Sequence, residues 1–149
     1  MNKNVAAAFA VAMSMTAFAG LAFAKGGTAV LTPAADLKWT DVQGFPGLKM
    51  AALDGDPAKA GHFMMKLPAG FSAPLHHHSP DHYVTVVSGT LVLTVDGKET
   101  KLPAGSYFSF KGKKAHMTKC DAGADCILFN DVRGKWDVVP EEKAAEKKK

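Results

Sequence analysis

The sequence predicts an all-β domain, and two features of its 149 residues support this class. Short apolar runs recur along the chain, and the intervals between turns leave no room for an amphipathic helix of useful length. Turn-forming residues separate the runs, as in Asp54-Gly55-Asp56-Pro57, Pro103-Ala104-Gly105 and Lys111-Gly112. Regular turns around short strands are typical of a β-sandwich or β-barrel. Because the sequence contains no internal repeat, we expect a single β-barrel.

The expected strands follow these apolar runs in chain order. They cover residues 47–53, 61–68, 82–89, 90–95, 99–103, 106–110, 115–120, 126–132 and 135–140. Asp96-Gly97 joins two of the runs and is the clearest hairpin signal, because both residues can adopt the positive φ of a type I′ turn. Tyr107 lies on a strand whose alternate side chains enter the barrel, so it is a candidate polar group of the pocket.

Residues 1–24 are predicted to be a cleaved secretory signal peptide. Lys3 precedes an uncharged, alanine-rich run, and the segment ends in Ala22-Phe23-Ala24, which fits an A-x-A cleavage site. An uncleaved membrane anchor is the alternative, which the weakly apolar run disfavours. We therefore expect a periplasmic or secreted protein that starts near Lys25 and has no stable membrane association after cleavage.

The remaining chain is expected to form one domain with short flanking segments. Residues 25–44 are expected to pack on the barrel, residues 45–139 to form the barrel domain, and residues 140–149 to be a charged tail. The net charge of +4 becomes +3 when Lys3 is removed with the signal peptide. This excess is too small to predict nucleic-acid binding.

The segment GFSAPLHHHSPDH contains four of the six histidines of the chain. If one strand runs through it, His76, His78 and His82 share a face and His77 points the other way. Two prolines indicate an irregular or edge position, as at the mouth of a barrel. In a hydrophobic core, each of three converging imidazoles would need its own hydrogen-bond partner. A metal ion instead accepts a lone pair from each neutral ring. The alternative is an adventitious histidine cluster on a loop.

This segment resembles the first motif of the cupin superfamily, G-x5-H-x-H-x3-E-x6-G. Gly70, His76, His78 and Gly89 match its fixed positions, and His82 stands where the family usually has glutamate. The segment Gly97-x5-Pro103-x-Gly105, followed eleven residues later by His116, resembles the second cupin region. The resemblance spans about residues 45–132.

Two further segments are similar to a small group of exported single-domain cupins, or monocupins: Gly105-Ser106-Tyr107 and the run from His116 to Cys120. The resemblance implies a jelly-roll-like double-stranded β-helix. Cupins commonly pair through their sheets, so the resemblance also implies a homodimer as one state of the chain.

The resemblance implies one divalent transition metal ion held by His76, His78, His82 and His116. Because histidine replaces the usual carboxylate, the ligands are all nitrogen atoms, which favours iron, zinc or copper over manganese or nickel. If all four rings bind, the site is closed and structural or metal-carrying. If His82 stays off the ion, open positions remain for substrate and for dioxygen or water. Asp81 faces away from His82 in a regular strand.

The predicted function is that of an exported, metal-binding cupin protein with a small-molecule substrate or ligand. One form of it is an oxygenase-type metalloenzyme, with His82 and Tyr107 as candidate catalytic residues. The alternative is a non-catalytic periplasmic protein that binds metal or a small ligand. An open three-histidine centre would favour the enzyme, and a closed four-histidine centre would favour the binding protein.

A disulfide between Cys120 and Cys126, the two cysteines of the chain, is also expected. Five small or polar residues separate them, so a hairpin loop would place them face to face, and an exported protein is oxidised. The alternative is a free Cys120 thiolate, four residues from His116, which would approach the metal and favour copper.

Overall fold

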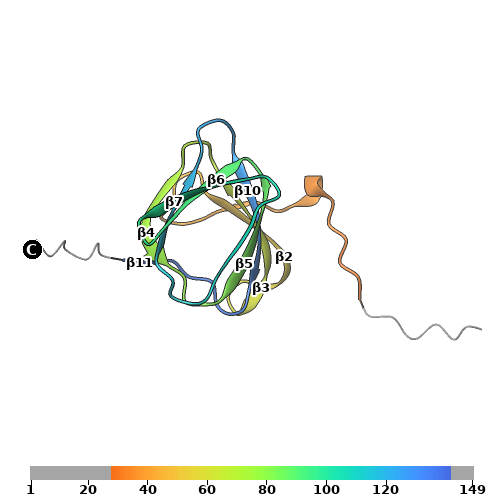
Figure 1. Ribbon diagram of the computed structural model, residues 1–149. Coiled ribbons are helices and arrows are strands. Elements are labelled where there is room, and N and C mark those ends of the chain that lie inside the picture. The colour runs from red at the N-terminus through yellow and green to blue at the C-terminus, as the bar shows by residue number, and fades with distance from the viewer. Residues whose placement is uncertain (1–27, 142–149) are drawn as a thin grey trace, which may run out of the picture.

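A computed structural model describes residues 28–141 of the chain, which fold into two antiparallel sheets (Figure 1). The predicted signal peptide, residues 1–24, and all but the first two residues of the predicted tail lie outside the described residues. The described residues include one short 3-10 helix, η1 (Ala34–Asp36). Within the same part of the chain, no helix is long and apolar enough to cross a membrane.

The larger sheet contains six of the described strands. In spatial order they are β1 (Thr40–Asp41), β2 (Lys49–Asp56), β3 (Ala60–Leu67), β10 (Cys126–Val132), β5 (His82–Ser88) and β8 (Tyr107–Phe110). The smaller sheet contains five. In spatial order they are β11 (Val139–Pro140), β4 (Ser72–His77), β9 (His116–Cys120), β6 (Thr90–Val95) and β7 (Lys98–Pro103).

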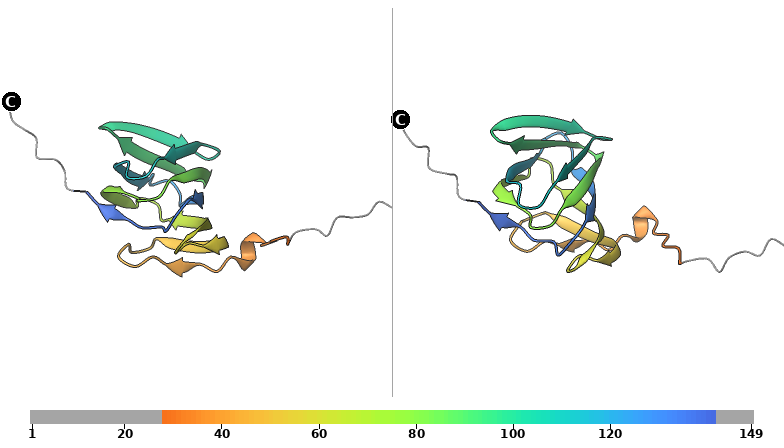
Figure 2. Two further views of the ribbon diagram at one scale, coloured as in Figure 1. Left: turned by 90° about the horizontal axis from the view of Figure 1, so that it is seen from below. Right: turned by 60° about the horizontal axis from the view of Figure 1, so that its bottom comes forward.

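From β3 onward the chain changes sheet at every described connection except the β6–β7 hairpin. The two sheets face each other in the views of Figure 2. The all-β prediction is therefore confirmed. The described strands do not close into one continuous barrel, however, because they form two separate sheets with no hydrogen-bonded ladder between them. The architecture is that of a sandwich with jelly-roll-like alternation between its sheets.

The predicted turn at Asp96-Gly97 is confirmed. The φ angles are +50° at Asp96 and +77° at Gly97, and Val95 pairs with Lys98 across the turn. Gly89, at the crossing from β5 to β6, also has a positive φ, of +76°. A Cβ atom there would lie 2.6 Å from the carbonyl oxygen of Asp125, so this crossing requires glycine.

No single strand runs through the four clustered histidines, so the condition under which His76, His78 and His82 would share a strand face is not met. Strand β4 ends at His77, and β5 begins at His82 in the opposite sheet. The Asp137 carboxylate stabilises the intervening corner by accepting hydrogen bonds from the Ser79 backbone N–H, at 2.7 Å, and from its hydroxyl, at 2.6 Å. Pro80 in the same corner cannot donate to a ladder. The expected last strand is also shorter than predicted and consists of β11 alone.

The hydrophobic core fills the space between the two sheets. Its most deeply buried members include Phe63, Leu67, Val84, Val86, Leu91, Cys126 and Val132. Partly buried side chains of Val42 and Phe45, which precede β2, pack against this core. The side-chain alternation along β5 and β10 thus directs one face of the larger sheet inward.

The predicted Cys120–Cys126 disulfide is present, with a Cα–Cα distance of 5.8 Å. It does not close a hairpin, because β9 and β10 belong to different sheets. It instead links the end of a strand in one sheet to the start of a strand in the other. Bridging of Cys120 also excludes its alternative role as a thiolate near the metal.

Replacement of both Cys120 and Cys126 with serine is expected to lower the free energy of unfolding by about 2 kcal/mol, the chain-entropy value for a loop of this length. Urea unfolding of the oxidised wild type and of the double variant measures this difference. Reduction of the wild type should produce a similar loss. An unchanged unfolding midpoint would mean that the link between the sheets contributes nothing to stability.

Candidate metal centre

Four buried histidines meet between the sheets. His76 lies near the end of β4, His78 follows that strand, His82 starts β5 and His116 starts β9. None of the four side chains is more than 6% exposed. The corner between β4 and β5 therefore brings His78 and His82 inward although no single strand carries them.

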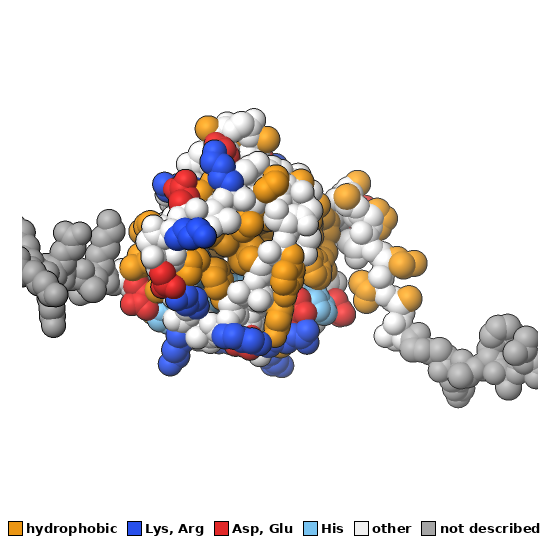
Figure 3. Space-filling model, in the orientation of Figure 1, with side chains coloured by type: hydrophobic (Ala, Val, Ile, Leu, Met, Phe, Trp, Pro, Cys, Tyr) orange, Lys and Arg blue, Asp and Glu red, His pale blue; other side chains and the backbone are white. Residues whose placement is uncertain are grey.

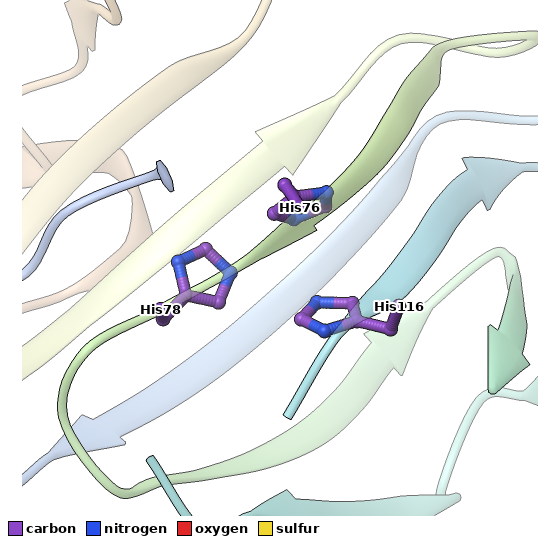
Figure 4. A group of neighbouring side chains, drawn as sticks. All are labelled: His76, His78 and His116. Atoms are coloured by element: carbon purple, nitrogen blue, oxygen red, sulfur yellow. The ribbon is translucent and has the colours of Figure 1, made fainter. Parts of the chain in front are cut away.

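Three of these rings form a compact group (Figure 4). His76, His78 and His116 each offer a nitrogen atom within 4.8 Å of the others. His82 lies at the edge of this group, with its ring centre 4.8 Å from that of His78 and 6.3 Å from that of His116. Whether His82 is a fourth ligand or stays off the ion remains a prediction.

Backbone carbonyls fix the protonation pattern of all four rings. The Nδ1 atom of His76 faces the carbonyl oxygen of Pro74 at 2.7 Å, and that of His116 faces the carbonyl oxygen of Lys114 at 2.9 Å. In the same way, the Nδ1 atom of His78 faces the carbonyl oxygen of Asp137, and that of His82 faces the carbonyl oxygen of Pro80. A carbonyl oxygen only accepts, so each neutral ring donates from Nδ1–H and keeps the lone pair on Nε2.

Burial keeps these rings neutral. Desolvation lowers the pKa of His78 to about 3 and that of His116 to about 4, and neighbouring histidines add to both decreases. Burial also lowers the pKa values of His76 and His82. Neutral imidazoles with Nε2 lone pairs are the form that binds transition metals, so the residues fit a divalent ion. Metal ligation by His76, His78, His82 and His116 stays a prediction.

Residues 134–141, here called the C-terminal strap, complete this site. The indole of Trp136 stacks on the His78 ring, with 3.9 Å between ring centres, while the Asp137 carbonyl accepts from the same ring. At the far end, the Glu141 carboxylate accepts a hydrogen bond from His77 at 2.6 Å. The sequence motifs gave no signal for this role, because the strap follows the second motif by many residues.

Asp137→Ala is expected to weaken metal binding by about 10- to 100-fold, the range found when outer-shell partners of a ligating histidine are lost. The carboxylate of Asp137 anchors the strap to Ser79, and the strap carbonyl orients His78. Competition with a chromophoric chelator measures the affinity. Asp137→Asn, which keeps an acceptor for Ser79, should restore most of it, and His62→Gln, which lies outside the strap and pairs with Asp131, is the control. An Asp137→Ala affinity equal to that of wild type would contradict this role.

The histidines lie along a cavity of about 70 Å³ between the sheets. Its wall is mainly apolar and includes Phe45, Leu48, Phe71, Phe108, Leu128 and Val138. Figure 3 looks onto the hollow between the sheets, where hydrophobic side chains are visible inside. The polar residues of this wall are the four histidines, Thr118 and Asn130. The arrangement combines nitrogen donors with a small cavity whose wall is mainly apolar.

Three other candidate residues lie outside the cavity. Tyr107 is 60% exposed and is not part of the wall, so its expected place in the pocket is wrong. Tyr107 and Phe108 are neighbours on β8, so their side chains point to opposite faces of the sheet, and the side chain of Phe108 lines the cavity. Asp81 accepts hydrogen bonds from the Gly112 N–H and the Lys111 ammonium, which direct its carboxylate away from the cavity wall. His77 points to the strap, as alternation predicted.

Comparisons with known proteins agree with this geometry. Residues 63–130 match the family model described as the cupin domain. A search of curated protein sequences found no match. Similar solved structures include the polyketide cyclase RemF from Streptomyces resistomycificus, with 16% identity, 80% of this chain and 89% of that chain covered, and a TM-score of 0.68.

Two further solved structures have the same fold. An RmlC-like cupin from Shewanella frigidimarina is 21% identical, with 71% of this chain and 92% of that chain covered and a TM-score of 0.58. The DMSP lyase DddQ from Ruegeria pomeroyi is 16% identical, with coverage of 78% and 73% and a TM-score of 0.59. Residues 63–130 thus match a cupin domain, and these neighbours share the fold of the chain.

Proposed function

We propose that this chain is an exported, metal-dependent cupin enzyme that acts on a small molecule in an oxygenase-type reaction. His76, His78 and His116 would hold one divalent transition metal ion, with iron and copper as the candidates suited to dioxygen chemistry and zinc as the redox-inactive alternative. The main support for this proposal is the group of three neutral, buried imidazoles beside a small apolar cavity. Three ligands leave coordination positions open.

The residues around the ion would have separate roles. The bound metal would supply electron transfer or Lewis acidity. The apolar wall would exclude water and orient a small substrate, and His82 would move a proton through its Nε2 atom. The Pro80 carbonyl holds the Nδ1–H of His82, which leaves Nε2 as the proton-accepting atom.

A non-catalytic protein that binds metal or a small ligand is the second candidate. It is favoured by one observation: His82 is 2% exposed and lies beside the three-histidine group. If the Nε2 atom of His82 also bound the ion, it would add a fourth nitrogen and close a tetrahedral site, which is typical of structural or carrier sites.

One experiment separates the two functions. The protein is purified without chelators or a histidine tag, its metal content is measured, and X-ray absorption and pulsed EPR spectra count the nitrogen ligands and exchangeable water. Three nitrogen ligands with exchangeable water, together with dioxygen consumption on a substrate panel, would support the enzyme. Four nitrogen ligands without water would support the binding protein.

Export and maturation near Lys25 belong to the same proposal. The Cys120–Cys126 disulfide is consistent with an oxidising compartment. Mass spectrometry of the protein recovered from the periplasm or medium would locate the mature N-terminus. An intact chain retained in the cytoplasm would contradict export. This outcome would not bear on the metal centre, which the preceding experiment tests.

A further inference from the structure

The proposed metal centre has an unusual charge balance, and the following inference rests on that centre. His76, His78 and His116 are neutral donors, so they would leave the full double charge on a divalent ion. His82, also neutral, occupies the motif position at which cupins usually have a glutamate. A doubly charged ion in a mostly apolar cavity is costly unless anionic groups offset part of its charge.

The nearby carboxylates have other partners. Asp137 binds Ser79 through both of its carboxylate oxygens. Asp81 binds the Gly112 N–H and the Lys111 ammonium. Neither residue belongs to the described cavity wall, and that wall contains no other carboxylate and no lysine or arginine. A negative charge at the ion would therefore come from the ligand.

The cavity also limits the body of the ligand. Its volume of about 70 Å³ is roughly half of the ~150 Å³ of an engineered cavity that holds benzene. The wall is formed mainly by aromatic and aliphatic side chains. A short aliphatic chain fits this volume and surface, whereas an aromatic ring or a sugar does not.

Asn130 adds a polar contact that the metal centre does not use. It lies on β10 opposite Val84, is 2% exposed and forms part of the cavity wall. Its amide nitrogen makes one long hydrogen bond, 3.4 Å to the Leu128 carbonyl oxygen. A side-chain amide offers two N–H donors and an oxygen acceptor, so Asn130 retains a donor for a ligand oxygen.

We propose that the centre binds a short-chain monocarboxylate. The carboxylate would offset the charge of the ion and accept a hydrogen bond from the Asn130 amide, and the short aliphatic chain would fill the apolar cavity. Replacement of the motif glutamate by His82 thus transfers the anionic group from the protein to its ligand.

The test uses the disulfide-intact, full mature chain loaded with Co²⁺, whose visible absorption reports ligand changes at the ion. Propionate is titrated against two matched probes: propionamide, which has the same shape without the charge, and benzoate, which has the charge with a larger body. Propionate is expected to change the spectrum with an affinity at least about 10-fold higher than that of either probe, equivalent to about 1.4 kcal/mol.

Two variants test the residues that carry the argument. Asn130→Leu keeps the side-chain volume and removes the amide, so propionate affinity should fall about 10-fold while Co²⁺ content is unchanged. His82→Glu supplies a carboxylate from the protein and should weaken propionate binding at least as much. His62→Gln is the control, because His62 lies on β3 outside this cavity and pairs with Asp131.

The outcomes separate this inference from the proposed function. Failure to bind one equivalent of Co²⁺ would overturn the metal centre and the inference with it. Stoichiometric Co²⁺ with no response to propionate, or with an equal response to propionamide, would overturn the inference alone. Equal binding of propionate by wild type and by His82→Glu would show that charge compensation is not the cause.

Discussion

Replacement of His116 with alanine is expected to abolish stoichiometric binding of divalent transition metals. The residue supplies one of three nitrogen donors that lie within 4.8 Å of one another, and it comes from β9, where it pairs with His76 on the neighbouring strand β4. Two remaining rings would hold an ion far less tightly, so the affinity should fall by more than the ~100-fold effect of losing an outer-shell partner. Metal analysis after dialysis, with zinc, copper or ferrous iron, measures the loss.

Three matched variants make this prediction specific. His78→Ala should lose metal as His116→Ala does. His62 lies on the outer side of the larger sheet, so His62→Ala should bind metal like the wild type. His82→Ala should retain the ion if three rings suffice. Full metal retention by His78→Ala or His116→Ala would remove that residue from the centre, and circular dichroism would establish that each variant is folded.

Much of the fold follows from local sequence patterns. The Asp96-Gly97 turn was predictable because two adjacent residues that tolerate positive φ separate alternating strands. The separation into two sheets was not predictable in this way, because sheet membership depends on contacts between strands far apart in the chain. The cysteines illustrate this limit: their spacing predicted a bond, and the structure shows that the bond joins different sheets.

The site was predictable to a similar depth. Motif spacing predicted the grouping of His76, His78 and His116, whereas strand alternation could not place His82, because no continuous strand connects it to His78. The corner at Ser79 turns the chain between His78 and His82 and leaves both rings facing the inside of the sandwich. The motif histidines therefore still lie close together. Trp136 could not be assigned a place beside His78 from sequence, because the contact depends on how the C-terminal strap returns across β4.

The same burial that prepares the histidines for metal also reduces stability in acid. A carboxylate at the position of His82 would attract a proton or cation, whereas neutral rings in a low-dielectric site resist protonation. Each ring is thereby kept in its metal-binding form below the pH at which free histidine becomes charged. The folded state consequently has a defined pH dependence.

The metal-free protein is expected to lose at least about 4 kcal/mol of unfolding free energy between pH 7.5 and pH 5.0 from His78 and His116 alone, and the burial of His76 and His82 adds to this loss. Burial lowers the pKa of His78 to about 3 and that of His116 to about 4, while the unfolded rings titrate near 6.5. Below pH 6.5 the unfolded chain therefore binds protons that the folded chain does not. Each ring contributes about 2 kcal/mol of this loss at pH 5.0, and the stability is fully present above pH 6.5.

Chemical unfolding of the metal-free, disulfide-intact protein at several pH values measures this dependence. His116→Gln removes one of the titrating rings and should reduce the difference between pH 7.5 and pH 5.0 by about 2 kcal/mol, even if the variant is less stable at both pH values. A wild-type stability that is constant across this range would mean that the four rings are accessible to protons in the folded state, and the neutral, metal-ready arrangement would then be wrong.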